Sequence, residues 1–358
     1  MTLNSISALR SFNQQLSNQE AKTAKDVACW MGAIQAQDFN MVKWAFGIRL
    51  PNSTEKSINE EIDSGRIIRT HLLRPTWHFV SSDDIYWIQK LSAAHIKSAL
   101  SYRDSQLGLT SRIFSKTNSA IEKILKNNIH LTREELFAGL VKSGLKLNNE
   151  QASHIFVRAE TEGIICSGRQ KKGKPTFALL NEWVPENKKR YNRDESLKEL
   201  GYRYFMSRGP ATVQDFAWWS GLSLSEARMG LEYNKSELVS EVIENQTFWF
   251  SDPPVNLDPN KGQVFLLPAY DEFLLSYRDR SASISDYDHK LAVSNNGIFY
   301  PVILAENQIT GTWKRKSKRE KIIISTNQFT TKLSAESMEN AVIRYSRFLV
   351  KKVELVLL

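Results

Sequence analysis

Apolar residues recur at helical spacing along much of the chain, and the clearest run lies in its middle third. One segment there opens with the capping-box pattern, Thr132 followed three positions later by Glu135, and ends at Gly144. Strand-like residues then flank a basic turn. The expected helices are residues 119–128, 131–144 and 148–163, and the expected strands are 164–168 and 176–180. Three helices followed by a two-stranded hairpin predict a winged helix.

The same order of elements recurs on both sides of this unit. The next stretch gives helices at 195–209, 212–221 and 223–234, and then strands at 237–243 and 246–251. Thr212 is placed to cap its second helix, as Thr132 does in the middle unit, and the hairpin turn falls at Glu244 and Asn245. An earlier, less regular copy gives helices at 21–34 and 57–65 and strands at 66–73 and 76–80.

The pattern changes after Ser251. A connector rich in Pro, Asp and Gly leads into alternating, strand-like segments, and a last amphipathic helix follows at residues 334–352. We therefore expect an α+β protein, with tandem winged-helix units followed by a mainly β module that carries a terminal helix. The expected units are residues 1–115, 116–190, 191–251 and 252–358.

Composition is that of a soluble globular protein. Of 358 residues, 41% are hydrophobic and 24% are charged, and no stretch approaches the roughly 18 apolar residues that span a membrane. The polar start lacks the apolar centre of a signal peptide. Two cysteines, Cys29 and Cys166, are too few for a disulfide framework. These features favour a cytoplasmic protein, which we expect to be a monomer.

Several catalytic and cofactor motifs are excluded. Residues 168–174 match G-x-x-x-x-G-K, but Pro175 stands where a P-loop needs Ser or Thr, and a strand follows instead of a helix. The histidines never fall three or four residues apart, so a helical metal pair is absent. We expect no metal, no nucleotide and no other cofactor.

Basic residues cluster where a winged helix would contact DNA. The net charge is +9, and lysines and arginines gather at the tip of one expected wing, in the linker after it and in the β module. Flexible cations of this kind contact phosphates; the alternative is that these loops are merely charged and solvated. The expected DNA-binding residues are Arg69, Arg169, Lys171, Lys172, Lys174, Lys188, Lys189, Arg190, Lys314, Arg315 and Lys316.

Four segments, in order and at their spacing, carry a resemblance to a known family. These segments are "IQAQD", "RIIRTHLLRPTWHFV", "PAYDEFLLSYRDR" and "ITGTWKR". From about Ala21 to the C-terminus, the chain resembles the HTH_42 family of winged-helix proteins, which includes the bacterial AlkZ and YcaQ DNA glycosylases. The resemblance implies a concave DNA-binding surface and the excision of alkylated purines, including bulky adducts and interstrand crosslinks. It also implies a catalytic Gln-x-Gln motif, here Gln35 and Gln37.

The implied chemistry suits two amides. Cleavage of an N-glycosidic bond builds positive charge on the sugar and requires a water on the face opposite the base. An alkylated purine already carries positive charge and leaves without a general acid, so amide oxygens that orient the water could suffice.

Geometry sets a condition on this hypothesis. On one α-helix, residues i and i+2 lie about 200° apart and cannot address the same water. The helix must therefore end near Ile34, with Asp38 capping the next helix or helping to hold the water. The alternative is that both glutamines are structural amides at a helix end.

The sequence thus favours a monofunctional DNA repair glycosylase that acts on duplex DNA, with Gln35, Gln37 and Asp38 as its catalytic residues. The competing hypothesis is a non-catalytic winged-helix DNA-binding protein, either a transcriptional regulator or an architectural protein. Asp271, Glu272, Arg278 and Asp279 are expected in an ion network that joins the β module to the winged helices. Two histidines of the first hairpin, His71 and His78, receive no assigned role.

Overall fold

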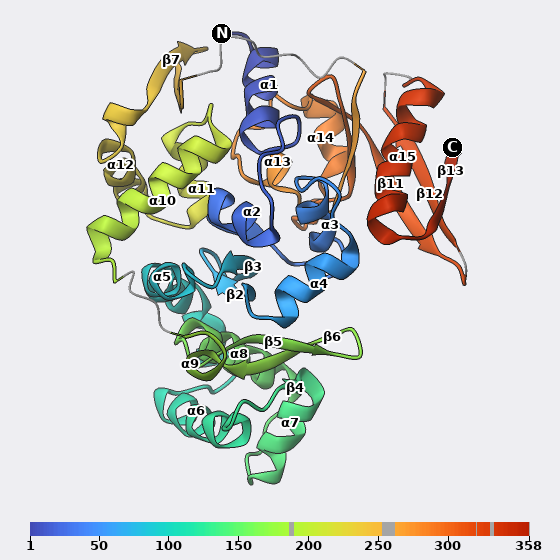
Figure 1. The fold of residues 1–358 in the computed structure, drawn as a ribbon. Coiled ribbons are helices and arrows are strands. Elements are labelled where there is room, and N and C mark those ends of the chain that lie inside the picture. The colour runs from blue at the N-terminus through green and yellow to red at the C-terminus, as the bar shows by residue number, and fades with distance from the viewer. Residues whose placement is uncertain (186–189, 253–261, 320, 330–332, 358) are drawn as a thin grey trace.

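The first winged helix carries the paired glutamines. The computed structural model describes residues 1–185, 190–252, 262–319, 321–329 and 333–357 (Figure 1). After the N-terminal helix α1 (Leu3–Asn13), this unit is built from α2 (Ala24–Met31), β1 (Ile34–Gln35), α3 (Val42–Gly47), α4 (Glu55–Asp63), β2 (Ile67–Leu72) and β3 (Thr76–Ser81). Its sheet has the order β1-β3-β2, with antiparallel pairing. A strand therefore stands between α2 and α3, where the sequence pattern had extended the helix to residue 34.

The second winged helix lies at the lower end of the view, beyond the long helix α5 (Ile85–Gln106) (Figure 1). Its elements are α6 (Ser111–Leu125), β4 (Leu131–Thr132), α7 (Arg133–Lys142), α8 (Asn149–Thr161), β5 (Ile165–Lys171), β6 (Lys174–Leu179) and α9 (Leu180–Trp183). The capping box is confirmed: the Thr132 side chain accepts from Glu135 N, and Glu135 Oε2 accepts from Thr132 N. A hydrophobic cluster of its own fills this unit, from Leu109 to Leu179.

The third winged helix repeats this order. It consists of α10 (Arg193–Arg208), α11 (Val213–Ser220), α12 (Leu224–Glu232), η1 (Lys235–Glu237), β7 (Val239–Ile243) and β8 (Gln246–Phe250). Thr212 caps α11 as expected, and the hairpin turns at Glu244 and Asn245, both with positive φ. A single bridge between Ala211 and Trp249 replaces the short first strand of the other units.

The C-terminal module contains β9 (Val264–Leu267), α13 (Glu272–Leu275), α14 (Asp286–Ala292), β10 (Val302–Ala305), β11 (Gln308–Ser317), β12 (Lys321–Gln328), α15 (Ala335–Leu349) and β13 (Lys352–Leu357). Its sheet has the order β13-β12-β11-β10-β9. The expected last helix is shorter than the pattern indicated, because the chain reverses at Val350 with φ 51. The residues that follow pair parallel to β12.

One large hydrophobic core joins the first winged helix, the third winged helix and the C-terminal module. Trp44 of α3 illustrates the junction: its ring packs against Tyr345 and Phe348 of α15, and its Nε1 donates to Leu266 O at 2.6 Å. The predicted fold class, tandem winged helices with a mainly β module and a terminal helix, is confirmed. The unit boundaries at residues 115, 190 and 251 stay predictions.

Candidate active site

The chain leaves the helix before it reaches the two glutamines. Helix α2 ends at Met31, Gly32 takes φ 70, and the chain then enters β1. The strand ends at Gln35, and the chain bends at Gln37. Gln35 and Gln37 line the same cavity, which has a volume of about 540 Å³. The condition set by the sequence, a helix that ends before Gln35, is met.

The backbone of this segment is bound by the first hairpin and by the C-terminal module. Gln35 pairs with His78 in the sheet, and its N–H donates to Glu272 Oε1 at 2.7 Å. Ala36 N donates to Trp77 O at 2.7 Å, and Arg69 Nε donates to Ala36 O at 3.0 Å. The backbone between the two glutamines is therefore fixed by the hairpin, while Glu272 fixes it from the C-terminal module.

The two amides differ in their surroundings. Gln35 is 4% exposed, and its Oε1 accepts from Arg74 Nη2 and from Thr76 Oγ1, each at 3.4 Å. A guanidinium only donates, so the carbonyl side of Gln35 is engaged and its NH₂ group is left for a ligand. Gln37 is exposed at the cavity. Of the two, Gln37 has the carbonyl oxygen that is open to a water.

Asp38 does not cap α3 as we considered, because the N-cap of that helix is Met41, whose side chain makes no capping hydrogen bond. Asp38 Oδ1 accepts from the N–H groups of Asn40 and Met41, both at 3.0 Å, at the turn that leads into α3. Asp38 also lines an adjoining hollow together with Gln37 and Tyr270. Asp38 therefore fixes the backbone of the turn that follows the two glutamines.

The opposite walls of the cavity come from distant parts of the chain. Trp218 of α11 is 42% exposed, although its neighbour Trp219 is fully buried. Arg74 lies at the tip of the first hairpin, and Arg280 follows α13. The remaining lining residues are Pro75, Thr76, Tyr270, Leu275, Val293, Asn296, Gly297, Ile298 and Phe299. Arg74, Trp218 and Arg280 were not among the expected site residues; of these, only Arg74 and Arg280 lie within the motifs that carried the family resemblance.

Glu272 is a buried carboxylate that binds the backbone of the glutamine segment. Its Oε2 accepts from Arg208 Nη2 at 2.8 Å, from Ser276 Oγ at 2.6 Å and from Trp219 Nε1 at 3.0 Å. Burial acts to raise the pKa of Glu272, but Arg208 and these hydrogen bonds outweigh it and lower the pKa to about 2.

The expected ion network is present in part: Glu272 pairs with Arg208, and Asp271 pairs with Arg49 at 2.7 Å. Arg278 and Asp279 were also expected in it, but they form no ion pair among the described residues; their backbone N–H groups donate to Asp215 Oδ1.

The histidines of the first hairpin are held by structural contacts. Burial and the nearby Arg74 lower the pKa of His78 to about 3, so this residue is neutral at physiological pH. His78 Nδ1 lies 3.0 Å from Thr76 O. His71 pairs with Glu160 of α8 and so links the first two winged helices.

Arg69 lies inside the protein. It is 8% exposed, its Nε binds Ala36 O, and its guanidinium stacks 4.2 Å from the centre of the Trp77 ring. Burial lowers the pKa of Arg69 to about 10. This placement favours a positioning role beneath the paired glutamines over the phosphate contact that we expected.

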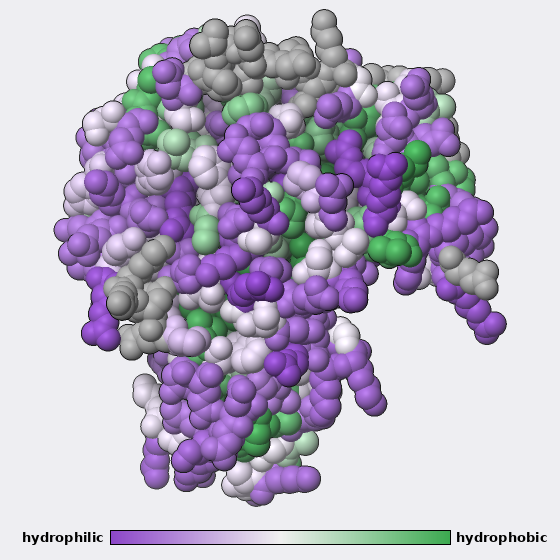
Figure 2. All heavy atoms as spheres, viewed as in Figure 1, coloured by the Kyte–Doolittle hydropathy of each residue, from purple (hydrophilic) through white to green (hydrophobic). Residues whose placement is uncertain are grey.

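The other expected DNA-binding residues lie on exposed hairpins and linkers. Arg169, Lys171, Lys172 and Lys174 are exposed on the β5–β6 hairpin, where Lys171 pairs with Glu135. Lys314, Arg315 and Lys316 are exposed on β11, and Arg190 is exposed before α10. Lys188 and Lys189 lie outside the described residues. Hydrophilic residues dominate the face shown in Figure 2, and this face is hollowed on the right. The β5–β6 hairpin and the β11–β12 hairpin border this hollow.

No group of His, Cys, Asp and Glu in the described part of the chain could hold a metal ion. No helix within the described ranges is long and apolar enough to cross a membrane.

Comparison with known proteins identifies the family. The chain matches the family described as DNA glycosylase AlkZ-like over residues 28–348. It is 22% identical over 356 residues to an interstrand DNA cross-link repair glycosylase of Streptomyces sahachiroi, covering 96% of this chain and 95% of that protein. The solved structure of Streptomyces sahachiroi DNA glycosylase AlkZ matches with a TM-score of 0.81 at 18% identity, over 100% of both chains. The predicted enzyme class is thereby confirmed, and the chain belongs to the AlkZ-like DNA glycosylase family.

Proposed function

We propose that this protein is a monofunctional glycosylase that hydrolyses the N-glycosidic bond of cationic alkylated purines in duplex DNA. Bulky adducts and interstrand crosslinks are included among its substrates. The observation that carries the proposal is that Gln35 and Gln37, which follow the end of α2, line one cavity. The name of the Streptomyces relative supports the crosslink substrate.

The geometry supports a division of labour between the two amides. Gln37, with an exposed side chain, accepts a hydrogen bond from the attacking water through its Oε1. Gln35, whose oxygen faces Arg74 and Thr76, presents its NH₂ group to the sugar or its phosphate. Asp38 fixes the turn after Gln37 and helps to set the angle of that side chain.

The reaction balances without a general acid. The bond between C1′ and the purine nitrogen breaks, and its electron pair neutralises the cationic base, which leaves. Water adds to the resulting oxocarbenium ion from the opposite face and then loses a proton to solvent, which yields an abasic site. An amide is too weak a base to keep that proton, so Gln37 orients the water and does not deprotonate it. No lysine is among the described residues that line this cavity, which supports hydrolysis over a Schiff-base mechanism.

Base release from duplex DNA containing N7-methylguanine tests the proposal. We expect Gln37→Ala to lower the single-turnover rate by about 100-fold or more, because a water-orienting contact is lost. Gln35→Ala should have a smaller effect, about 10-fold. The matched control is Gln106→Ala, which removes an exposed glutamine of α5. Wild-type rates in the Gln37→Ala variant would refute the assignment, and absence of base release by the wild type would refute the activity.

A further inference from the structure

Two arginines line the cavity together with the paired glutamines. Arg74 and Arg280 come from different units, yet both guanidiniums lie against the ring of Trp218, 5.9 Å and 5.6 Å from its centre. Arg280 also lies 5.1 Å from the centre of the Phe299 ring. The two cations and the exposed indole thus form one continuous wall of the cavity that holds Gln35 and Gln37.

Neither cation is neutralised by the described part of the protein. Among the described residues, neither Arg74 nor Arg280 forms an ion pair, and Arg74 Nε and Arg280 Nη2 are buried without a hydrogen-bond partner. The guanidinium of Arg280 donates to the carbonyl oxygens of Leu274 at 2.9 Å and Arg278 at 3.4 Å. Burying a cation without a compensating anion is unfavourable, so this wall has the character of an anion-binding surface.

The electrostatics agree with this geometry. Burial and, to a smaller extent, the charge of Arg74 lower the pKa of Arg280 to about 10, against the opposing effect of Asp215 and Asp279. Burial likewise lowers the pKa of Arg74. An anion between the two guanidiniums would oppose both effects and remove their mutual repulsion.

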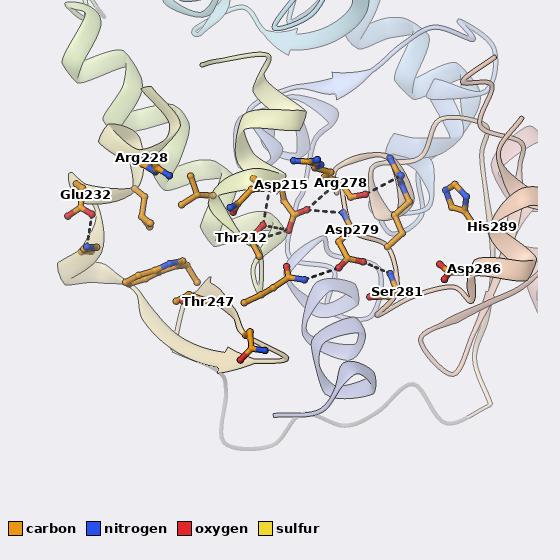
Figure 3. Close-up of a pocket in the computed structure, with 18 residues that line it drawn as sticks. Thr212, Asp215, Arg228, Glu232, Thr247, Arg278, Asp279, Ser281, Asp286 and His289 are labelled. Atoms are coloured by element: carbon orange, nitrogen blue, oxygen red, sulfur yellow. Dashed lines mark hydrogen bonds and ion pairs between the residues drawn. The ribbon is translucent and has the colours of Figure 1, made fainter. Parts of the chain in front are cut away.

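The position of Arg280 indicates what kind of anion fits. Arg280 lines the glutamine cavity and also a larger, polar cavity of about 850 Å³ between the third winged helix and the C-terminal module. Figure 3 shows this second cavity, with Arg278 and Asp279 lying between Asp215 on one side and His289 on the other. An anion at the junction of two cavities can belong to a chain that continues on both sides. A phosphodiester has that property, and arginine forks match its oxygens.

We propose that Arg74, Trp218 and Arg280 form a clamp that binds the phosphodiester next to the reacting nucleotide, and that the neighbouring nucleotide enters the larger cavity. This inference rests on the proposed function. The clamp positions the substrate and one of the glutamines together. Arg74 also donates to Gln35 Oε1, so phosphate binding and the orientation of this amide depend on the same guanidinium. Arg74 and Arg280 are therefore positioning residues.

Neutral phosphate analogues test the clamp directly. Short duplexes would carry one N7-methylguanine and a methylphosphonate at either the 5′ or the 3′ phosphate of that nucleotide. Their affinity would be measured by fluorescence anisotropy with wild type, Arg280→Ala, Arg280→Lys and Arg74→Ala. The charge-matched control is Arg112→Ala, which removes an exposed arginine of α6 in the second winged helix.

We expect one of the two methylphosphonates to weaken wild-type binding by about 10-fold or more, as for other charge-assisted contacts. The same substitution should change the affinity of Arg280→Ala by less than about 2-fold, because the contact is already lost. Arg280→Lys should retain part of the sensitivity, and Arg112→Ala should retain all of it. If Arg280→Ala and Arg74→Ala remain as sensitive as the wild type, or if neither analogue affects the wild type, the clamp is wrong.

Binding separates this inference from the proposed activity. A wild-type protein that releases no base but shows the methylphosphonate pattern would refute the glycosylase mechanism and keep the clamp. Base release that depends on Gln37, without the methylphosphonate pattern, would support the glycosylase mechanism and refute the clamp. Circular dichroism melting identifies any variant that is unfolded, and the comparison then rests on Arg280→Lys.

Discussion

Glu272 shows how one buried residue can serve both the fold and the site. Its Oε1 accepts from the backbone N–H of Gln35, and its Oε2 accepts from Arg208, Ser276 and Trp219. All polar contacts of this carboxylate are with donors, so an ionised side chain satisfies them and a neutral one cannot. The position of the glutamine segment therefore depends on a charge in the C-terminal module.

We predict that Glu272→Gln lowers the free energy of unfolding by about 3 to 5 kcal/mol. The variant leaves the fully buried Arg208 without its counter-charge and turns one amide NH₂ toward donors. Urea denaturation followed by tryptophan fluorescence measures the change. Glu354→Gln is the control: it removes a carboxylate that pairs with Lys321 at the surface, and we expect little change there.

The same residue predicts a pH dependence. Glu272 has a pKa of about 2 in the folded protein, against an ordinary value of 4.5. Its stabilising contribution is therefore complete above pH 4.5 and is lost as the pH falls from 4.5 toward 2. Wild-type stability should decline in that window, and Glu272→Gln should remove this part of the decline. Equal pH dependence in both proteins would contradict the assignment.

Adjacent residues can differ in ways that sequence does not reveal. Trp218 and Trp219 lie in one apolar run, yet Trp219 is fully buried against Glu272 and Trp218 faces the cavity. A helical pattern assigns both to a core, because neighbouring side chains differ by only about 100° around a helix. Which of them meets a ligand depends on what other units pack nearby. Arg69 shows the opposite case, a cation that resembled a DNA contact and is buried.

At the scale of elements, capping and turn residues were the most informative parts of the sequence. Thr132, Thr212 and the turn at Glu244 and Asn245 all lie where local chemistry placed them. Strand β1 was the element that periodicity could not separate from α2, because it has only two residues. The need for both glutamines to share a face predicted the break that the pattern concealed. The walls built from α11 and the residues after α13 could not be predicted, since they depend on how the units dock.

Close packing between α3 and α15 predicts a sensitive glycine. A Cβ at Gly47 would lie 2.5 Å from Phe348 Cδ2 and 2.9 Å from Trp44 Cε3. We expect Gly47→Ala to destabilise the protein by about 1 to 3 kcal/mol, because two helices must separate. Thermal melting measures this effect. Gly139→Ala, where the nearest atom is the terminal carbon of Ile124 at 3.2 Å, should stay within about 1 kcal/mol of wild type; equal losses in both variants would contradict the prediction.

At the scale of the whole molecule, most buried apolar residues of the second winged helix form a core of their own, while Cys166 and Leu180 of this unit belong to the core that joins the other units. We predict that Leu136→Ala, at a fully buried position, costs about 2 to 5 kcal/mol and loosens this unit first. Hydrogen exchange should increase across residues 109–179 and stay unchanged in β9 to β12. Ile324→Ala, in the core that joins the other units, should increase hydrogen exchange in β9 to β12 and leave it unchanged across residues 109–179. Uniform loss of protection in Leu136→Ala would show that the units unfold together.

DNA affinity sums over many contacts, so the charged hairpins of the whole molecule can be tested through the salt dependence of DNA binding. Lys172 and Lys174 are exposed at the β5–β6 tip, whereas Lys171 is held by Glu135. Each phosphate contact contributes about 0.9 to the slope of log affinity against log salt concentration. We expect the double variant Lys172→Gln and Lys174→Gln to reduce that slope by about 2. Lys171→Gln should reduce it by less than about 0.5. An unchanged slope in the double variant would place this wing away from DNA, and the concave face would then bind through β11 and the site alone.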